Sequence, residues 1–374
     1  MKKFRTLITG ILSLAMCVSV SGVSASASTS TTYLKGDVNG NGTVDLTDLT
    51  NLSLFLGGSN STADDLMSQR LDVDLDGIID YCDIDAIADI VRQSASTYSI
   101  AYTSTNESIP AQSAVSYGKY NASTGAKVGN NYTLSPVSSI TDMSPRAIIG
   151  NDTREIDYSK SGVVRLNYTK LIDGVAKRYV VTGFVVDEHT ILTSAHCLYE
   201  AEKEALAYDL SYTLYSSDGT SNGTYGADYY HVPQAYLDLS SYSPESDYAL
   251  ITVSQDLYDY MCFDLGVARD KVRNTNPEIY VTGYSVINNP SRPELFFEMV
   301  TGSGFLAESK TSSKCLYYNT DTVGGESGSP VYVMNSDGSM TVIGIHSGSN
   351  GAYSNTAKRI DTNIMHFIYN NPNL

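Results

Sequence analysis

A serine placed among glycines constrains this chain more than any other feature. It lies in residues 324–330, which read GGESGSP. Glycine adopts backbone angles that other residues avoid, so this run predicts a tight turn. In such a turn the amides of Gly325 and Ser327 would point at one spot and stabilise a negatively charged oxygen that develops during acyl transfer. The run therefore indicates a loop that presents Ser327 as a nucleophile, with an ordinary glycine-serine loop as the alternative.

Two upstream motifs supply the groups that would activate this serine. His196 follows an apolar run within the sequence TSAHC, and Asp247 stands directly before another apolar run. The chain order His, Asp, Ser is the chymotrypsin-type order of a catalytic triad, in which the histidine is the general base and the aspartate orients it. His196 as a core histidine and Asp247 as a turn cap are the alternatives, because Asp238 and Asp256 lie nearby. Only Asp247 directly precedes a strand-like run, so we expect the triad His196, Asp247 and Ser327.

The length, the net charge and the N-terminal sequence limit the class of protein to which this chain can belong. With 374 residues the chain is long enough for two or more domains, and its net charge of −17 argues against a nucleic acid partner, which needs a basic face. Residues 1–27 combine basic side chains, an apolar stretch and a small-residue cleavage site, which is typical of a secretory signal peptide. We therefore expect a secreted, extracellular protein with no membrane association after signal removal. A retained membrane anchor is the alternative.

Cysteines are few for an exported protein. Cys82, Cys197, Cys262 and Cys315 remain after removal of the signal, and their spacing does not match that of metal ligands. Free thiols are the expected state, and a disulfide between Cys262 and Cys315 is the alternative.

Two acidic loops after the signal have the spacing of a calcium-binding loop. In each, oxygen-bearing side chains fall at alternate positions, a glycine allows a sharp turn, and an aspartate closes the loop. Each loop leads into a stretch with apolar residues at helical spacing, residues 46–56 and 84–91. One such loop could be an acidic turn, but the repetition predicts two Ca²⁺ sites. The expected ligands are Asp37, Asn39, Asn41, the Thr43 carbonyl, Asp45 and Asp48 in the first loop, and Asp72, Asp74, Asp76, the Ile78 carbonyl, Asp80 and Asp83 in the second.

This duplicated loop-helix unit, which ends each loop with aspartate, closely resembles the dockerin type I module over residues 33–94. The resemblance implies a small α-helical, calcium-binding domain that docks onto a cohesin domain of a cellulosome-like scaffold protein. By the same resemblance, Leu46, Thr47, Tyr81 and Cys82 would face this partner. They differ from the commonest residues at these positions, so which cohesin binds stays open.

The rest of the chain divides into two regions by composition. Residues 95–146 are rich in Ser, Thr, Asn and Tyr without a sustained apolar period, which predicts a linker merged with a propeptide. A spacer that is never cut is the alternative. Residues 147–374 contain short β-rich runs separated by turn residues, which predict an all-β sandwich or barrel. Expected strands include 162–168, 179–186, 190–192, 249–253, 279–282 and 342–345, and a final helix is expected over 362–369.

Residues 147–374 also resemble the trypsin/chymotrypsin-like serine proteases, and among them the glutamyl endopeptidase branch. The similarity is carried by residues 148–154, 182–184, 193–197, 320–325 and 344–346 together with the triad motifs. It implies a chymotrypsin-like double β-barrel with a C-terminal helix and hydrolysis of peptide bonds.

The resemblance also implies a specificity for acidic residues. His346 would recognise the carboxylate of the residue before the cut bond through a charge-assisted hydrogen bond, with Thr322 and Ser349 as hydroxyl donors. No acid stands at Thr322, which argues against cleavage after Lys or Arg. Cleavage after Glu, with Asp weaker, is therefore the prediction.

Two departures from this branch bear on folding and maturation. Val181 stands where close relatives often carry a cysteine, which leaves Cys197 without its expected partner. Glu326, directly before the expected nucleophile, stands where the branch usually has a neutral residue. An acid there is typical of trypsin-like zymogens, in which a freed α-amino group pairs with it. We therefore expect cleavage after Arg146 or nearby, which would expose a terminus around Ala147 or Ile148 and separate the protease from its docking module. Whether the freed amine meets Glu326 or helps to line the acid pocket stays open.

The sequence thus predicts a secreted serine endopeptidase tethered through a calcium-dependent dockerin, in which Ca²⁺ serves folding and no cofactor serves catalysis. The alternatives are a catalytically silent protease-like binding module, a broad-specificity cellulosomal protease, and a scaffold component whose main role is cohesin binding. The physiological substrate stays open.

Overall fold

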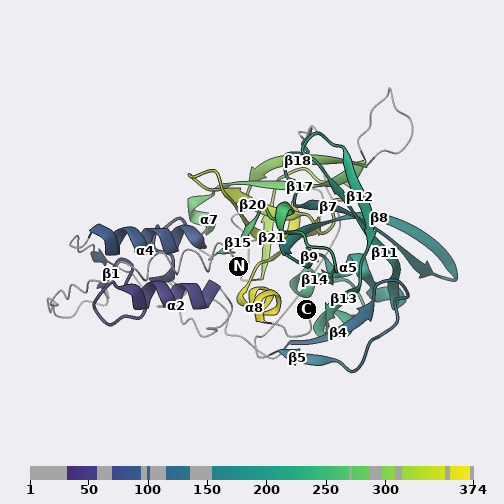
Figure 1. Cartoon of the computed structure of the whole chain (residues 1–374), viewed down its shortest axis with the longest axis horizontal. Coiled ribbons are helices and arrows are strands. Elements are labelled where there is room, and N and C mark those ends of the chain that lie inside the picture. Colours follow the sequence, from purple (N-terminus) through teal and green to yellow (C-terminus); the bar gives the residue numbers. More distant parts are fainter. Residues whose placement is uncertain are drawn as a thin grey trace.

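The computed structural model describes residues 32–56, 70–93, 99–101, 115–134, 154–268, 272–286, 297–307, 314–349 and 354–370. Two β-sheets make up most of this part of the chain, and a helical unit lies against one side of them (Figure 1). The expected signal peptide, residues 1–27, falls outside the described residues. Within the described ranges, no helix has the length and the apolarity that crossing a membrane requires.

The first sheet is antiparallel and contains ten described strands in the order β10-β11-β7-β8-β9-β14-β13-β4-β5, with β12 paired to β11. Its longest hairpin turns through Asp173 and Gly174, which both have positive φ, as a two-residue turn between twisted strands requires. Val164, Leu166 and Ile191 are fully buried in the core of this sheet. The strands are β4 (Val115–Asn121), β5 (Tyr132–Leu134), β7 (Val163–Ile172), β8 (Val175–Asp187), β9 (Thr190–Thr193), β10 (Tyr199–Glu200), β11 (Ala205–Tyr215), β12 (Ser221–Gly226), β13 (Tyr229–Pro233) and β14 (Ala249–Thr252).

The second sheet contains eight described strands in the order β19-β22-β21-β20-β17-β18-β6, with β15 paired in parallel to β21. The strands are β6 (Glu155–Ile156), β15 (Asp264–Leu265), β17 (Glu278–Val286), β18 (Phe297–Phe305), β19 (Cys315–Tyr318), β20 (Pro330–Met334), β21 (Met340–Ser349) and β22 (Asn355–Arg359). The short helices of this region are α5 (Ala195–Leu198), α6 (Gln234–Leu237), α7 (Val272–Thr275) and the 3-10 helices η2 (Ala201–Lys203), η3 (Pro244–Ser246) and η4 (Tyr258–Tyr260). The expected strands are all present, and the expected last helix is α8 (Thr362–Asn370). The all-β prediction for the catalytic region is therefore confirmed.

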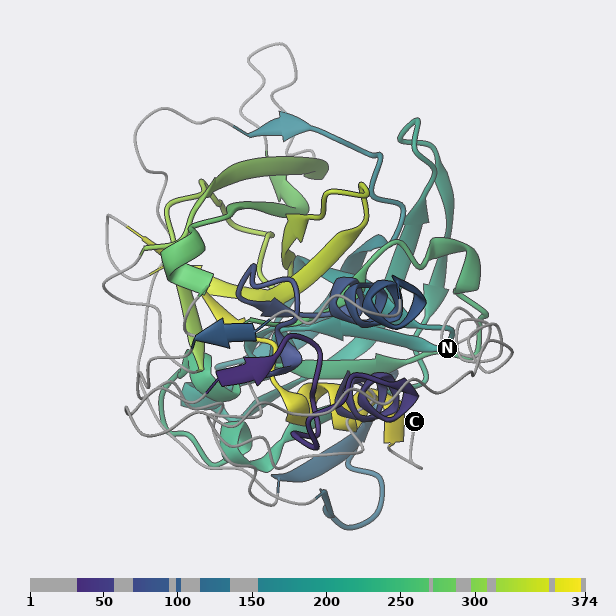
Figure 2. The ribbon, with the colours of Figure 1, turned by 90° about the vertical axis from the view of Figure 1, so that its left-hand side faces the viewer.

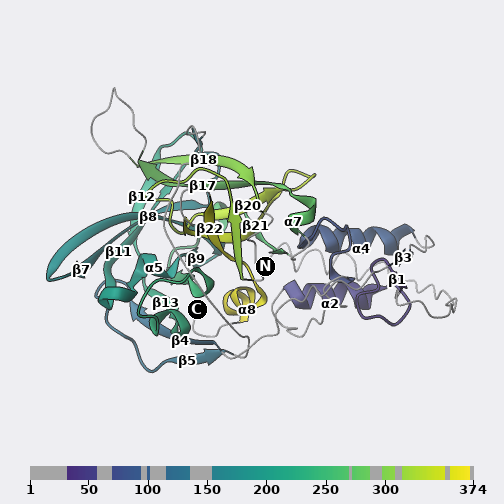
Figure 3. The same cartoon turned by 180° about the vertical axis from the view of Figure 1, so that it is seen from behind.

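A helical unit lies beside the two sheets, as Figures 2 and 3 show from two directions. It contains α2 (Leu46–Leu56) and α4 (Tyr81–Gln93), which follow the two acidic loops, and β1 (Thr32–Leu34) paired to β3 (Ser99–Ala101). The first predicted helix coincides with α2, and the second lies inside α4. Leu52 of α2 and Ile87 of α4 belong to one buried cluster with Phe367 of α8, so the unit shares a core with the catalytic region.

Main-chain pairing also joins the helical unit to the catalytic region. β2 (Ile78–Ile79), which belongs to the second acidic loop, pairs antiparallel with β16 (Val267–Ala268). Thr341, near the start of β21, donates a hydrogen bond to Asp80 Oδ2 at 2.6 Å. Thr275 of α7 donates another to the Asp76 carbonyl at 2.9 Å. The second acidic loop is thus built into the surface of the second sheet.

The structure corrects the linker predicted over residues 95–146. Within it, β4 pairs with β13 and β5 extends the same edge of the first sheet. Tyr117 of β4 is buried, stacks on Phe367 with ring centroids 4.0 Å apart, and shares a 2.6 Å hydrogen bond between hydroxyl groups with Tyr248. The sequence concealed this strand because tyrosine rings, rather than an aliphatic period, provide its buried surface. Residues 115–134 are therefore part of the folded catalytic region.

Candidate active site

The expected histidine and aspartate meet because two neighbouring strands end at the same place. β9 and β14 pair antiparallel, so α5, which follows β9, lies next to the residue that precedes β14. Asp247 Oδ2 lies 2.8 Å from His196 Nδ1, and the His196 amide donates to Asp247 Oδ1 at 2.8 Å. The Asp247 side chain is fully buried, whereas that of His196 is 23% exposed. The alternative acids, Asp238 and Asp256, accept hydrogen bonds from other groups.

The surroundings of His196 favour its charged form. Burial acts to lower the pKa of His196, but the charge of Asp247, the Cys197 sulfur and hydrogen bonds to both raise it to about 10. Cys197 Sγ lies 3.8 Å from Nε2 of the imidazole. Behind the ring, the buried Lys170 Nζ donates to the His196 carbonyl at 2.7 Å. The imidazole is therefore firmly held and becomes a neutral base at higher pH than an ordinary histidine.

The serine lies on a turn that only glycine neighbours permit. Gly325 and Gly328 have φ of +110° and +86°. A Cβ at Gly325 would collide with the Tyr284 carbonyl, and one at Gly328 would collide with the Thr182 carbonyl. Thr182 of β8 also holds the turn, because its amide donates to the Ser327 carbonyl at 3.0 Å and its hydroxyl to the Gly325 carbonyl at 2.9 Å. A strand of the first sheet thus positions the serine turn that precedes β20 of the second.

The serine turn and the histidine helix meet at one carbonyl group. Ser194, which caps α5, donates its hydroxyl to the His346 carbonyl at 2.9 Å, and the Gly328 amide donates to the same oxygen at 2.8 Å. Among the described residues, no hydrogen bond joins the Ser327 hydroxyl to His196. Catalytic hydrogen bonds are often long in substrate-free structures and tighten when substrate binds.

Two amides of the serine turn have no acceptor among the described residues. The amides of Glu326, Gly328 and Ser329 all donate to backbone carbonyls, whereas those of Gly325 and Ser327 do not. A buried amide without a partner is rare and costs free energy unless a ligand uses it. These are the two amides that the sequence predicts as the oxyanion hole, and they can donate to a developing negative oxygen.

Two of the three expected specificity residues, His346 and Ser349, lie in the second half of β21. His346 is buried, and its Nδ1 lies 2.6 Å from the Tyr318 hydroxyl. Burial raises the pKa of Tyr318 well above its ordinary value, so this hydroxyl stays protonated and can donate to Nδ1. The proton of a neutral His346 would then sit on Nε2. Ser349, at the end of β21, pairs with Asn355 of the neighbouring strand β22. Asn355 pairs in turn with Tyr318 of β19, the strand on the other side of β22.

Two of the expected specificity residues carry buried hydroxyl groups that lack partners among the described residues. Thr322 and Ser349 are each 1% exposed, and their hydroxyl oxygens have no hydrogen bond within the described part of the chain. Both are therefore suited to donate to a ligand. The sequence analysis passed over Asp321, which is buried directly before Thr322. Position 322 itself carries a threonine, as expected, and a buried carboxylate precedes it in the chain.

Glu326 has a cationic partner within the intact chain. Its Oε2 lies 2.7 Å from Arg154 Nη1, and both side chains are buried. In the uncut chain, Arg154 thus occupies the side of Glu326 on which a freed α-amino group could also pair. The sequence placed Arg154 within a family motif but gave no sign of its partner, which lies far along the chain.

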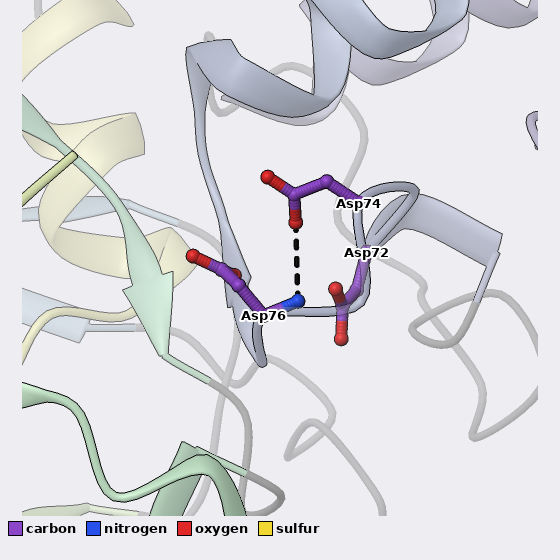
Figure 4. Close-up of side chains that lie close together, drawn as sticks. All are labelled: Asp72, Asp74 and Asp76. Carbon is purple, nitrogen blue, oxygen red and sulfur yellow. Dashed lines mark hydrogen bonds between the residues drawn. The ribbon is translucent and has the colours of Figure 1, made fainter. Parts of the chain in front are cut away.

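Three carboxylates converge in the second acidic loop (Figure 4). One oxygen from each of Asp72, Asp74 and Asp76 lies within 4.8 Å of the others. The Asp76 amide donates to Asp74 at 3.1 Å, and Asp83 closes the loop by accepting from the amides of Val73 and Asp80. Burial and the neighbouring carboxylates raise the pKa of Asp76 to about 7. This oxygen-rich, self-repelling donor set fits a hard divalent cation such as Ca²⁺.

The first acidic loop has the same construction. Asp48 closes it by accepting from the amides of Asn39 and Asp45, at 3.0 and 2.9 Å. Asp37 accepts from the amides of Asn41 and Gly42. The repeat seen in the sequence is therefore also a repeat of hydrogen-bond geometry.

The two pairs of residues expected to face a partner differ in accessibility. Thr47 of the first repeat is exposed, and the side chain of Leu46 lies outside the described residues. Tyr81 and Cys82 of the second repeat are half-buried. Burial and the charge of Asp264 in β15 raise the pKa of Tyr81 to about 12. The second repeat therefore turns this pair toward the catalytic region of the same chain.

Within the described part of the chain, Cys82, Cys197, Cys262 and Cys315 form no disulfide. Cys197 is buried beside the imidazole of His196 without a disulfide partner. Cys17 lies outside the described residues.

Comparison with known proteins identifies the catalytic region. Residues 181–345 match the family model of the trypsin-like peptidase domain. The chain is 26% identical over 244 residues to a Bacillus subtilis protein named extracellular metalloprotease, which covers 62% of this chain and 70% of that protein. It is 23% identical over 222 residues to a glutamyl endopeptidase of Staphylococcus aureus. That alignment covers 59% of this chain and 57% of the relative, so the chain spans little more than half its length.

Among solved structures, the chain matches a Glu endopeptidase in complex with MPD, at 18% identity and a TM-score of 0.45, covering 59% of this chain and 97% of that one. Another is a thermostable serine protease from an extremophilic microorganism, at 14% identity and a TM-score of 0.42, covering 57% and 97%. The family match, together with the curated relatives, shows that this chain carries a trypsin-like serine peptidase domain.

Proposed function

We propose that this chain is a secreted endopeptidase in which Ser327, His196 and Asp247 carry out acyl transfer. The observation that supports it most is the 2.8 Å contact between His196 and Asp247 beside a glycine turn whose Gly325 and Ser327 amides have no acceptor among the described residues. A hydroxyl nucleophile, a general base, an orienting carboxylate and two amide donors are the groups that peptide hydrolysis by acyl transfer requires.

In the reaction, the Ser327 hydroxyl attacks the carbonyl carbon of the peptide bond, and Nε2 of His196 accepts its proton. The buried Asp247 carboxylate stabilises the imidazolium through Nδ1. The amides of Gly325 and Ser327 stabilise the oxyanion. His196 then donates its proton to the leaving amine, and a water molecule activated by His196 hydrolyses the acyl-enzyme.

Cleavage after Glu, with Asp weaker, is the specificity we infer from His346. With Nδ1 accepting from Tyr318, a neutral His346 carries its proton on Nε2, and this N–H is the group that would donate to a substrate carboxylate. The unpartnered hydroxyl groups of Thr322 and Ser349 add two donors, and the name of the staphylococcal relatives agrees with this inference. The buried Asp321 supports a second candidate, cleavage after a basic residue.

A peptide library tests the two specificities. The full chain is expected to cut after Glu, and His346→Gln should reduce kcat/KM for Glu peptides at least tenfold while sparing activity on other residues. A preference for Lys or Arg that Asp321→Asn abolishes would establish the second candidate instead. Labelling of the parent by a fluorophosphonate, lost in Ser327→Ala, separates an active enzyme from a silent binding module.

We further propose that the helical unit is a dockerin that binds a cohesin of a scaffold protein. Asp72, Asp74 and Asp76 would hold one Ca²⁺ with the Ile78 carbonyl, Asp80 and Asp83, and the first loop would hold a second ion. Bound Ca²⁺ would neutralise the crowded carboxylates and so order the loops. Thr47 is exposed whereas Tyr81 is half-buried, so docking would use the first repeat. Capture on immobilised cohesins should require Ca²⁺ and weaken in Thr47→Asp, but not in the exposed control Thr220→Asp.

A further inference from the structure

A buried ion pair lies directly behind the proposed nucleophile. Arg154 Nη1 is 2.7 Å from Glu326 Oε2, and the two side chains are 4% and 0% exposed. Glu326 is the residue before Ser327 in the chain. Arg154 Nη1 also donates to Ser285 Oγ in β17, which connects the pair to the second sheet. A buried charge is stable only with a well-placed partner, so the position of Glu326 depends on Arg154.

The carboxylate of Glu326 also ties together the turn that carries the oxyanion amides. Its Oε2 accepts a hydrogen bond from the Val323 amide, while the Glu326 amide donates to the Val323 carbonyl at 3.2 Å. Gly325 lies inside this small ring of contacts, and its φ of +110° is open to other backbone conformations because glycine has few restrictions. Loss of the carboxylate's position would therefore free the Gly325 peptide to rotate and would turn its amide away from the substrate oxygen.

We propose that Arg154 is a positioning residue that holds the oxyanion turn in its working conformation through Glu326. This inference rests on the proposed function of Ser327. Its consequence is that an internal guanidinium does what a freed amino group does in trypsin-like zymogens. The intact chain is then competent for catalysis without a cut near Arg146.

The first experiment compares processed and unprocessed protein. The full chain and its Arg146→Gln variant are treated with a fluorophosphonate, and the labelled species are identified by intact mass. Both are expected to react at the same rate while residues before 146 remain attached. Labelling that occurs only after removal of these residues would overturn the inference. No labelling of any form would instead contradict the proposed role of Ser327.

The second experiment tests the ion pair itself. Arg154→Met is expected to lower kcat by about 10²- to 10³-fold with little change in KM, because the loss of one oxyanion donor has that effect in related chemistry. The double variant Arg154→Met/Glu326→Gln removes both buried charges and is expected to recover thermal stability without recovering kcat. Lys160→Met, which breaks a half-exposed ion pair with Asp157, is the matched control and should leave kcat unchanged.

Thermal melting of each variant separates positioning from folding. A well-folded Arg154→Met protein with parental kcat would overturn the inference. If Arg154→Met does not fold, the Arg154→Met/Glu326→Gln variant tests the inference in its place. A parental kcat in the folded double variant would show that neither charge positions the turn. Arg154→Lys, which keeps the charge but loses the fork of donors, is expected to fall between the parent and Arg154→Met.

Discussion

Replacing Thr341 by valine tests whether the acidic loops and the catalytic sheets fold as one body. The Thr341 hydroxyl donates to Asp80 Oδ2 at 2.6 Å, and both residues are buried. A hydrogen bond to a charged group contributes about 1.5–3 kcal/mol, and removal of the donor leaves a buried carboxylate oxygen without it. About 1 kcal/mol shifts the Tm of a domain of this size class by about 2–4 °C. The variant should therefore melt about 3–12 °C below the parent.

The assay is differential scanning calorimetry of the full chain with Ca²⁺ and with a chelator. Because Asp80 is an expected Ca²⁺ ligand, chelation should lower the melting temperature of the catalytic region as well as that of the helical unit, and by less in Thr341→Val than in the parent. Thr169→Val is the matched control, since the Thr169 hydroxyl in β7 has no hydrogen bond among the described residues. The reasoning fails if Thr341→Val melts with the parent. It also fails if chelation shifts only a separate transition of the helical unit.

Four further outcomes follow from the site and the fold. In the pH profile of kcat/KM, the midpoint of the acid limb should lie above the ordinary histidine pKa of about 6.5. The base must be neutral to act, and the pKa of His196 is raised to about 10. Asp247→Asn should move the acid limb to lower pH and should lower kcat by about 10⁴-fold. An acid limb at the parental pH would contradict the role assigned to Asp247. Tyr117→Ala should destabilise the chain to urea by about 3–5 kcal/mol, whereas Tyr225→Ala on the surface should not. Fragments cut at residue 146 should coelute in gel filtration, since β4 stays paired with β13; their separation under native conditions would show that this pairing is weak.

Local pattern predicted the longer helices and about a third of the strands in the two sheets, but not others such as β11, β18 and β22. Strands β8, β9 and β14 are read from short apolar runs between turn residues, and α2 from helical spacing. The chain order of the motifs also anticipated the contact between His196 and Asp247. Strand β4 was missed because its buried face consists of tyrosines, whose hydroxyl groups and neighbouring Ser, Gly and Asn make the segment look polar.

Contacts between distant, individually unremarkable side chains could not be predicted. Nothing local indicates that Arg154 meets Glu326, which lies 172 positions away, or that Thr341 meets Asp80, which lies 261 positions away. Tyr318 is one of many tyrosines, and only the pairing of β19 with β22 and of β22 with β21 brings it to His346. These pairings depend on the register between strands, which a single sequence does not encode in any short pattern.

The strand β21 connects all parts of the molecule that the proposed function needs. At its start Thr341 bonds to the second acidic loop, and farther along His346 faces Tyr318 with its side chain. The backbone carbonyl of His346 accepts from both Ser194 of the histidine helix and Gly328 of the serine turn. Because one rigid strand makes these contacts, ordering of the acidic loop by a cation would restrict the same element that aligns the specificity wall and the triad. Under the proposed function, the helical unit would therefore support the peptidase in addition to docking onto a cohesin.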